Sequence, residues 1–237
     1  MNTKNNATAR MSYDNVKQTL FEAWVKNFGN PEQVRQYVES LKLAESEVRL
    51  ENTLTANNTN YTFGVTPQQN STSGVKFRSE QRLNQGDTLI ITSYGIFVGL
   101  PSTTDPNDVN WKLQSYANPF LFGAADAALI NNFLYSNGNL KLTVNNDVLI
   151  PNIDLWRNVY VPETQQTAAI GAASPIDQIC GAEDGFVAVE PNLYLIGTKN
   201  SIPEIILPAA MATLAATTAR VVIKFRGFLA QNSTVFS

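Results

Sequence analysis

Histidine is absent from the chain of 237 residues, and cysteine occurs once, at Cys180. Without histidine there can be no Ser-His-Asp or Cys-His nucleophile, no His-ligated zinc or iron and no imidazole pH switch. A single thiol can form neither an internal disulfide nor a thiolate metal cage, so nothing indicates an oxidising compartment. We interpret Cys180 as a packed or incidental thiol, and the sequence predicts no metal and no cofactor.

The chain also lacks phosphate-binding motifs, long apolar runs and a high content of charge. Neither GxxxxGKS/T nor GxGxxG occurs, and no apolar run approaches the roughly 20 residues that span a bilayer. The first residues, MNTKNNATAR, lack the apolar core of a signal peptide. Charged residues make up 16% of the chain and the net charge is -3, which disfavours a general nucleic-acid binder. We expect assembly in a cytoplasm, with an uncharged polar surface suited to contacts between proteins.

Acidic pairs and aromatic residues in two predicted loops are the remaining candidates for chemistry. The stretch 105–108 (DPND) could bind a hard cation, but it lacks the spacing of a calcium loop, so we favour a solvated turn. The pair 183–184 (ED) could serve glycoside hydrolysis, and a surface position explains it equally simply. Trp111 and Tyr116 could stack on a sugar or base, or could pack their loop against the rest of the domain. Because none of these forms a catalytic set, we predict that the protein is not an enzyme.

The N-terminal part of the chain has the pattern of a tail followed by a helical hairpin. Residues 1–11 are predicted to be a flexible tail, and residues 12–46 to be the hairpin. Ser12 or Asp14 can cap the first helix. The triplet 29–31 (GNP) places a glycine at the end of the first helix and an Asn-Pro start on the second.

Aromatic residues gather on one side of the first predicted helix. Phe21, Trp24 and Phe28 recur there at helical spacing, and Tyr37 lies on the apolar stripe of the second helix. These rings could pack on their own domain, or they could face another subunit, because so short a hairpin cannot bury its aromatic side alone. The candidate subunit-interface residues, including the two in the long loop, are Phe21, Trp24, Phe28, Tyr37, Trp111 and Tyr116.

Residues 47–237 show the alternation and turn chemistry of antiparallel β-structure. Between Leu129 and Pro162, Leu140, Leu142 and Val144 alternate with polar residues, which indicates a strand with one buried face. Asn137-Gly138 before this run and Asn145-Asn146-Asp147 after it predict tight turns, and residues 159–161 predict a returning strand. We therefore expect an antiparallel meander over this stretch.

Two further runs predict strands in the middle of a sheet. Residues 87–101 (DTLIITSYGIFVGLP) are apolar enough for a central strand covered on both faces, with Gly95 marking a bulge or bend. Residues 219–232 (ARVVIKFRGFLAQN) alternate clearly and come late, which predicts a terminal strand inserted beside much earlier ones. The loops 101–118 and 163–184 are long enough to make contacts or carry function.

The runs NGNLKLTVNNDVLIPNIDLW (137–156) and ARVVIKFRGFLAQN (219–232) resemble the strands of bacteriophage capsid proteins of the jelly-roll kind. This resemblance implies a mainly β fold, an antiparallel jelly-roll sandwich preceded by the helical hairpin, with a compact double jelly roll as an open variant. It also implies a structural virion protein, assembled in the host cytoplasm, whose trimers or pentamers build an icosahedral shell. The partners would be further copies and other virion proteins. Sequence-specific nucleic-acid binding is not expected, and contact with an internal membrane or the genome stays open.

Two other classes of function remain compatible with the sequence. A phage accessory or host-attachment protein that binds glycans would be stabilised by its ligand and would form no shells. An all-β hydrolase working through carboxylates would lose turnover when a single Asp or Glu is replaced.

Overall fold

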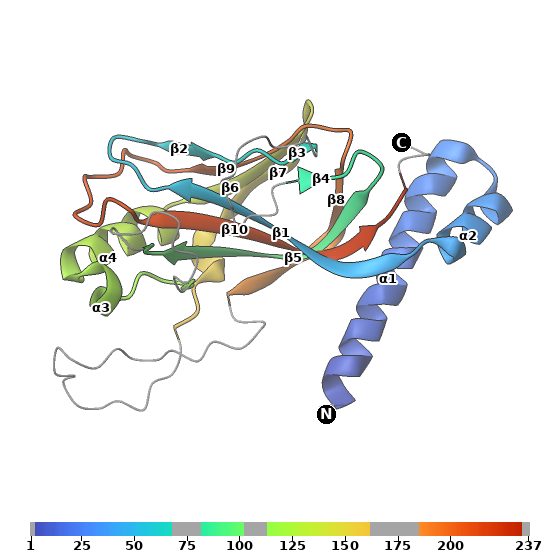
Figure 1. The fold of residues 1–237 in the computed structure, drawn as a ribbon, viewed down its shortest axis with the longest axis horizontal. Helices are drawn as coiled ribbons and strands as arrows, with labels where there is room; N and C mark the ends of the chain where they lie inside the picture. Colours follow the sequence, from blue (N-terminus) through green and yellow to red (C-terminus); the bar gives the residue numbers. More distant parts are fainter. Residues whose placement is uncertain (1–2, 68–81, 102–112, 162–184, 234–237) are drawn as a thin grey trace.

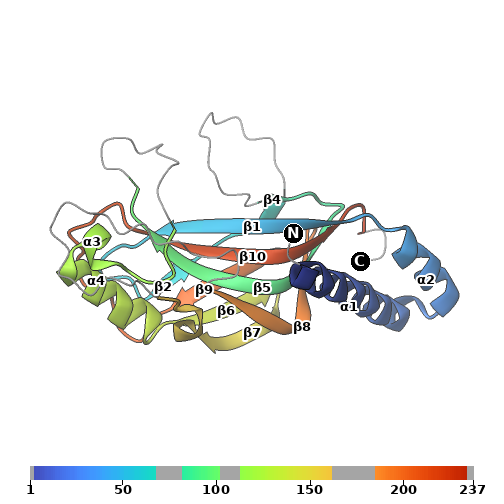
Figure 2. The same cartoon turned by 90° about the horizontal axis from the view of Figure 1, so that it is seen from below.

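The computed structural model describes residues 3–67, 82–101, 113–161 and 185–233. Two four-stranded antiparallel sheets face each other, with helices at both ends of the sandwich (Figure 1 and Figure 2). The first sheet contains, in spatial order, β1 (Leu43–Thr53), β10 (Arg220–Ala230), β5 (Thr88–Gly99) and β8 (Phe186–Ile196). The second sheet contains β2 (Asn60–Thr62), β9 (Ser201–Ile206), β6 (Asn139–Val144) and β7 (Asp147–Asp154). A small parallel pair joins β3 (Thr66–Pro67) to β4 (Arg82–Leu83).

The strands of the two sheets pair in a nested order. Counting only these eight strands, the first pairs with the last (β1 with β10) and the second with the seventh (β2 with β9). The third pairs with the sixth (β5 with β8) and the fourth with the fifth (β6 with β7). The pairs β10·β5 and β9·β6 then complete the two sheets. The prediction of a mainly β fold with antiparallel sheets and a short N-terminal helical region is confirmed, and the described strands form one sandwich.

The strand β5 lies inside the first sheet, between β10 and β8, as the sequence predicts. Leu89 and Ile91 belong to the core between the sheets, whereas Ile90 faces the N-terminal helices. The predicted bulge at Gly95 is wrong, because the register shifts at Thr92 instead. Gly95 keeps regular pairing, and a Cβ there would lie 2.6 Å from the Phe97 ring, so its small size makes room for an aromatic side chain.

The predicted meander is correct in its second half. Leu140, Leu142 and Val144 are buried, and the chain turns from β6 into β7 through Asn145, whose φ is 53°. The first predicted hairpin turn is wrong. Asn137-Gly138 follows a π-helical turn, η1 (Asn131–Tyr135), and the Gly138 N–H closes it by donating to the Leu134 carbonyl at 2.9 Å.

The predicted strand at residues 159–161 is also wrong. β7 is followed by a short 3-10 helix, η2 (Leu155–Asn158), after which residues 159–161 have no regular structure. The reason is a long-range anchor. The buried Asn158 amide donates to the carbonyls of Tyr94 at 3.3 Å and Gly185 at 3.2 Å, so the chain bends here to reach the first sheet.

The first N-terminal helix begins earlier than the sequence predicts. α1 (Thr3–Phe28) starts within the segment 1–11 that we expected to be a tail, so Ser12 and Asp14 are not its caps. Residues 3–12 contain neither Gly nor Pro and include the strong helix formers Ala, Lys, Arg and Met, which explains the earlier start.

The second helix and the first strand follow a compact connection. α2 (Pro31–Ser40) is capped by Asn30, as predicted, and its side chain accepts from the Gln33 N–H at 3.5 Å. Gly29 has a φ of 70°, the left-handed conformation expected at the end of α1. The first strand then begins at Leu43, four residues before the predicted domain boundary at 47.

The opposite end of the sandwich carries α3 (Pro119–Phe122) and α4 (Ala124–Ile130) (Figure 1). The buried Asp126 fixes α4 to the connection between β9 and β10. Its carboxylate accepts the N–H groups of Ala215 at 3.1 Å and Ala216 at 2.7 Å. The connection therefore has a defined path, and β10 enters the first sheet between β1 and β5, which confirms the predicted insertion of the last strand.

Candidate interaction surfaces

The N-terminal helices pack on the outer face of the first sheet through a small hydrophobic cluster of their own. This cluster is separate from the main core between the sheets. Tyr194 of β8 donates to the Thr19 carbonyl of α1 at 3.3 Å, and the Tyr13 ring meets the Phe228 ring edge-on, with centroids 5.8 Å apart. The buried members of the cluster are Val16, Leu20, Val34, Val38, Leu41, Ile90 and Ala230.

Three of the predicted interface residues lie at this junction of helices and sheet. Phe21, Trp24 and Tyr37 are half-buried against the cluster. The Trp24 and Tyr37 rings have centroids 5.3 Å apart, and the Tyr37 hydroxyl donates to the Asn232 carbonyl at 3.0 Å. Partial burial raises the pKa of Tyr37 above its ordinary value. These rings therefore pack in part on their own sandwich, and their contact with another subunit stays a prediction.

Of the other predicted interface residues, the side chain of Tyr116 alone lies within the described residues. Tyr116 is half-buried and precedes by three residues the helix α3, which lies at the end of the sandwich opposite to α1 and α2 (Figure 1). Trp111 and the side chain of Phe28 lie outside the described residues. So do the acidic stretches 105–108 and 183–184, and Cys180.

A patch of exposed apolar side chains follows β7. Trp156 is 62% exposed, Val161 57%, Val159 39% and Tyr160 37%. The first and last residues of η2, Leu155 and Asn158, are buried and anchor the helix. Trp156 between them is exposed. This Trp156 patch was not predicted from the sequence, because residues 159–161 have the composition of a strand. A tryptophan followed within five residues by three further large apolar residues, without period-2 alternation, was the available signal.

Charged side chains line the exposed part of the outer face of the first sheet. Glu47 on β1 pairs with Lys224 at 2.8 Å and Arg226 at 3.4 Å on β10. The Arg226 guanidinium lies 3.7 Å from the centroid of the Phe186 ring. Such cross-strand ion pairs stabilise a sheet modestly. A second set of pairs joins Glu51 to Arg49 at 2.6 Å and to Arg220 at 3.0 Å.

We expect Glu47 to make the fold sensitive to acid. Burial acts to raise the pKa of this carboxyl, but the hydrogen bond and charge of Lys224, with Arg226, outweigh it and leave the pKa below its ordinary value. A depressed pKa in the folded state means that the ionised carboxylate stabilises the fold above the unfolded pKa, and that this contribution is lost as pH falls through the folded pKa. The free energy of unfolding should therefore fall less steeply from about pH 7 to about pH 3 in Glu47→Gln than in the parent.

Urea unfolding at a series of pH values measures this difference. Glu45→Gln, which removes an exposed carboxylate two residues earlier on the same strand, is the matched control. Equal pH slopes for the parent and Glu47→Gln would show that the ion pairs do not persist in solution.

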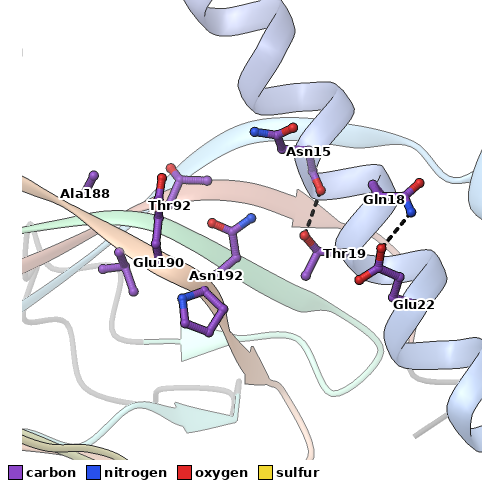
Figure 3. Close-up of a pocket in the computed structure, with 10 residues that line it drawn as sticks. Asn15, Gln18, Thr19, Glu22, Thr92, Ala188, Glu190 and Asn192 are labelled. Carbon is purple, nitrogen blue, oxygen red and sulfur yellow. Dashed lines mark hydrogen bonds between the residues drawn. The ribbon is translucent and has the colours of Figure 1, made fainter.

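A groove of about 500 Å³, lined by both polar and apolar residues, lies between α1 and β8 (Figure 3). Its β8 wall exists because the strand makes an excursion. Ile91 pairs with Leu193 and Ser93 with Ala188, so residues 189–192 leave the ladder. These four residues line the groove together with residues of α1. This wall includes Glu190 and Asn192.

The α1 wall of the groove is one polar face of the helix. Asn15, Gln18, Thr19 and Glu22 recur at helical spacing, and Asn192 faces this side of α1 across the groove (Figure 3). Gln18 donates to the Glu22 carboxylate at 2.7 Å, which holds both side chains on the groove rim. The groove could not be predicted from the sequence, because its α1 and β8 walls are 166 or more residues apart in the chain.

Comparison with known proteins adds no family to these observations. No family model, no curated protein and no solved structure matches this chain. The described residues contain no cluster of His, Cys, Asp and Glu side chains that could hold a metal ion. Among the same residues, no helix is both long enough and apolar enough to cross a membrane.

Proposed function

We propose that this chain is a bacteriophage coat protein that forms an icosahedral shell by self-association, and that its sandwich is a single jelly roll. The nested strand order supports the jelly-roll proposal. An eight-stranded antiparallel ribbon that is folded over into two sheets pairs first with last, second with seventh, third with sixth and fourth with fifth, and the strands pair in this order. Viral coat proteins, lectins and cupins all use this architecture, so strand order alone does not choose the function.

The Trp156 patch is the observation that supports self-association. Exposed clusters of large apolar side chains are characteristic of protein–protein interfaces, and Trp and Tyr dominate the binding energy of such interfaces. Trp156, the most exposed residue of the patch, lies on an anchored 3-10 helix, so little conformational entropy would be lost when its backbone is held in an interface. In a shell, one such interface repeats by symmetry, and modest contacts accumulate to a stable particle.

In this proposal the protein acts by forming contacts between subunits and carries out no chemical reaction. The sandwich provides a rigid body, the Trp156 patch and the helical end provide contacts with neighbouring subunits, and the virion is the place where the protein acts. The amide- and hydroxyl-rich surface inferred from the low charge content suits these contacts, because fewer charges lose their water when subunits meet.

Size-exclusion chromatography with light scattering, followed by electron microscopy of the purified full chain, tests the proposal. We expect megadalton shells, or trimers and pentamers that convert to shells as the concentration rises. A chain that stays strictly monomeric at high concentration would refute self-association. A monodisperse trimer that never forms shells would instead favour a host-attachment protein.

A further inference from the structure

The first turns of α1 have a basic sequence. Residues 1–12 include Lys4 and Arg10 and no carboxylate. Figure 1 shows the N-terminal end of α1 projecting beyond the sheets. An isolated helical segment of about three turns is only marginally stable in water, so a partner of opposite charge would stabilise this part of α1.

The groove between α1 and β8 has the opposite charge. Glu22 and Glu190 contribute carboxylates, and neither lysine nor arginine is among its described lining residues. Asn15, Gln18 and Asn192 add amides that can both donate and accept hydrogen bonds. Ala188, Val189 and Pro191 add an apolar part to the lining, against which the aliphatic stems of long cationic side chains can pack.

The basic turns of a chain cannot enter the groove of the same chain. Residues 3–12 and the groove residues 15–22 belong to one uninterrupted helix, α1 (Thr3–Phe28). Reaching the groove from within would require this helix to break and fold back on itself. A second copy meets no such restriction, since its α1 can lie beside the first.

We propose that the groove of one copy receives the basic N-terminal turns of α1 from a second copy, with Lys4 and Arg10 of one chain facing Glu22 and Glu190 of the other. This inference rests on the proposed self-association and names one of its contacts. The two α1 helices lie side by side, each closing the polar face of its neighbour. Ion pairs at such an exposed site are individually weak and are screened by salt, so the contact acts by setting orientation and adds to the apolar interface.

A charge-reversal cycle on the full chain tests this contact. The basic-turn variant is Lys4→Glu with Arg10→Glu, the groove variant is Glu22→Lys with Glu190→Lys, and the third protein combines all four changes. By sedimentation velocity at low salt, we expect roughly tenfold weaker self-association in each of the first two variants. The combined variant should return to the parent value, because its charges are complementary again. High salt should reduce the differences among the proteins.

The matched control is Glu32→Lys with Glu39→Lys, which makes the same change of charge on exposed positions of α2 outside the groove. It should associate like the parent, and melting temperatures establish that every variant is folded. If the parent forms shells and the two half-variants associate as well as it does, or the combined variant fails to recover, the contact is refuted and the proposed function stands. If the parent does not associate at all, both proposals fail.

Discussion

Replacing Gly227 with alanine is expected to destabilise the fold by several kcal/mol, enough to unfold most of the protein. Gly227 lies in β10 where the register shifts against β5, opposite Ile91. A Cβ atom there would overlap the Ile90 carbonyl oxygen and lie 2.8 Å from the carbonyl carbon. Both atoms are backbone of the central strand, so neither can move aside as a flexible side chain could.

Gly29→Ala is the matched control for this substitution. Gly29 also needs its lack of a side chain, because its φ is 70°, but nothing lies within 4 Å of the Cβ position. Backbone strain alone costs about 1 kcal/mol. Urea unfolding of both variants separates the two effects. If Gly227→Ala costs no more than Gly29→Ala, the close approach of β10 to β5 is not present in solution.

The parts of the fold that were predictable from the sequence are those specified by local pattern. The alternation from Val221 to Phe225 and the apolar run from Thr88 to Gly99 each identify a strand, and their strength indicates positions inside a sheet. Asn30 before Pro31 identifies a helix start. The Asn30 side chain caps an N–H only three residues later, and the proline ring fixes the backbone of the first helical residue, so both effects are local. Such signals depend on neighbours in the chain and survive without knowledge of the tertiary structure.

The parts that were not predictable depend on contacts between distant residues. Asn137-Gly138 has the chemistry of a hairpin turn, yet it closes a helix because Leu134 is held in the core. Residues 159–161 have strand propensity, but Asn158 binds the carbonyl of Tyr94, 64 residues earlier. In the candidate interface, the helical spacing of Phe21 and Trp24 predicts that they share one face of α1. The hydrogen bond from Tyr37 to Asn232 joins distant parts of the chain, so no local pattern predicts it. The bulge at Thr92 likewise depends on the partner strands and not on Gly95.

The packing of α1 and α2 changes how a role for the helices in assembly can be tested. Deleting residues 1–42 would uncover Ile90 and Ala230, which are fully buried beneath the helices. A truncated chain would expose this apolar face of the first sheet, so its failure to assemble could reflect aggregation. Substitutions on side chains that are already exposed avoid this ambiguity, because the core keeps its contacts.

The double substitution Trp156→Ser and Val161→Ser is expected to abolish shell formation while the subunit stays folded. The two side chains are 62% and 57% exposed, so they contribute little to the core. At an interface, truncation of a buried tryptophan typically costs about 2–4 kcal/mol, or roughly 30- to 1,000-fold in affinity for each contact. Because every subunit in a closed shell repeats the contact, the loss multiplies over the particle.

Val148→Ser is the control for the Trp156 patch. Val148 is 51% exposed on β7, so its replacement removes a similarly exposed apolar side chain outside the patch, and it should leave assembly unchanged. Electron microscopy and light scattering across a concentration series measure assembly, and thermal melting measures the fold. If the double variant forms shells at the same concentration as the parent, the Trp156 patch is not a subunit interface. If both variants lose assembly equally, exposed apolar area in general drives association, and the anchored 3-10 helix has no special part in it.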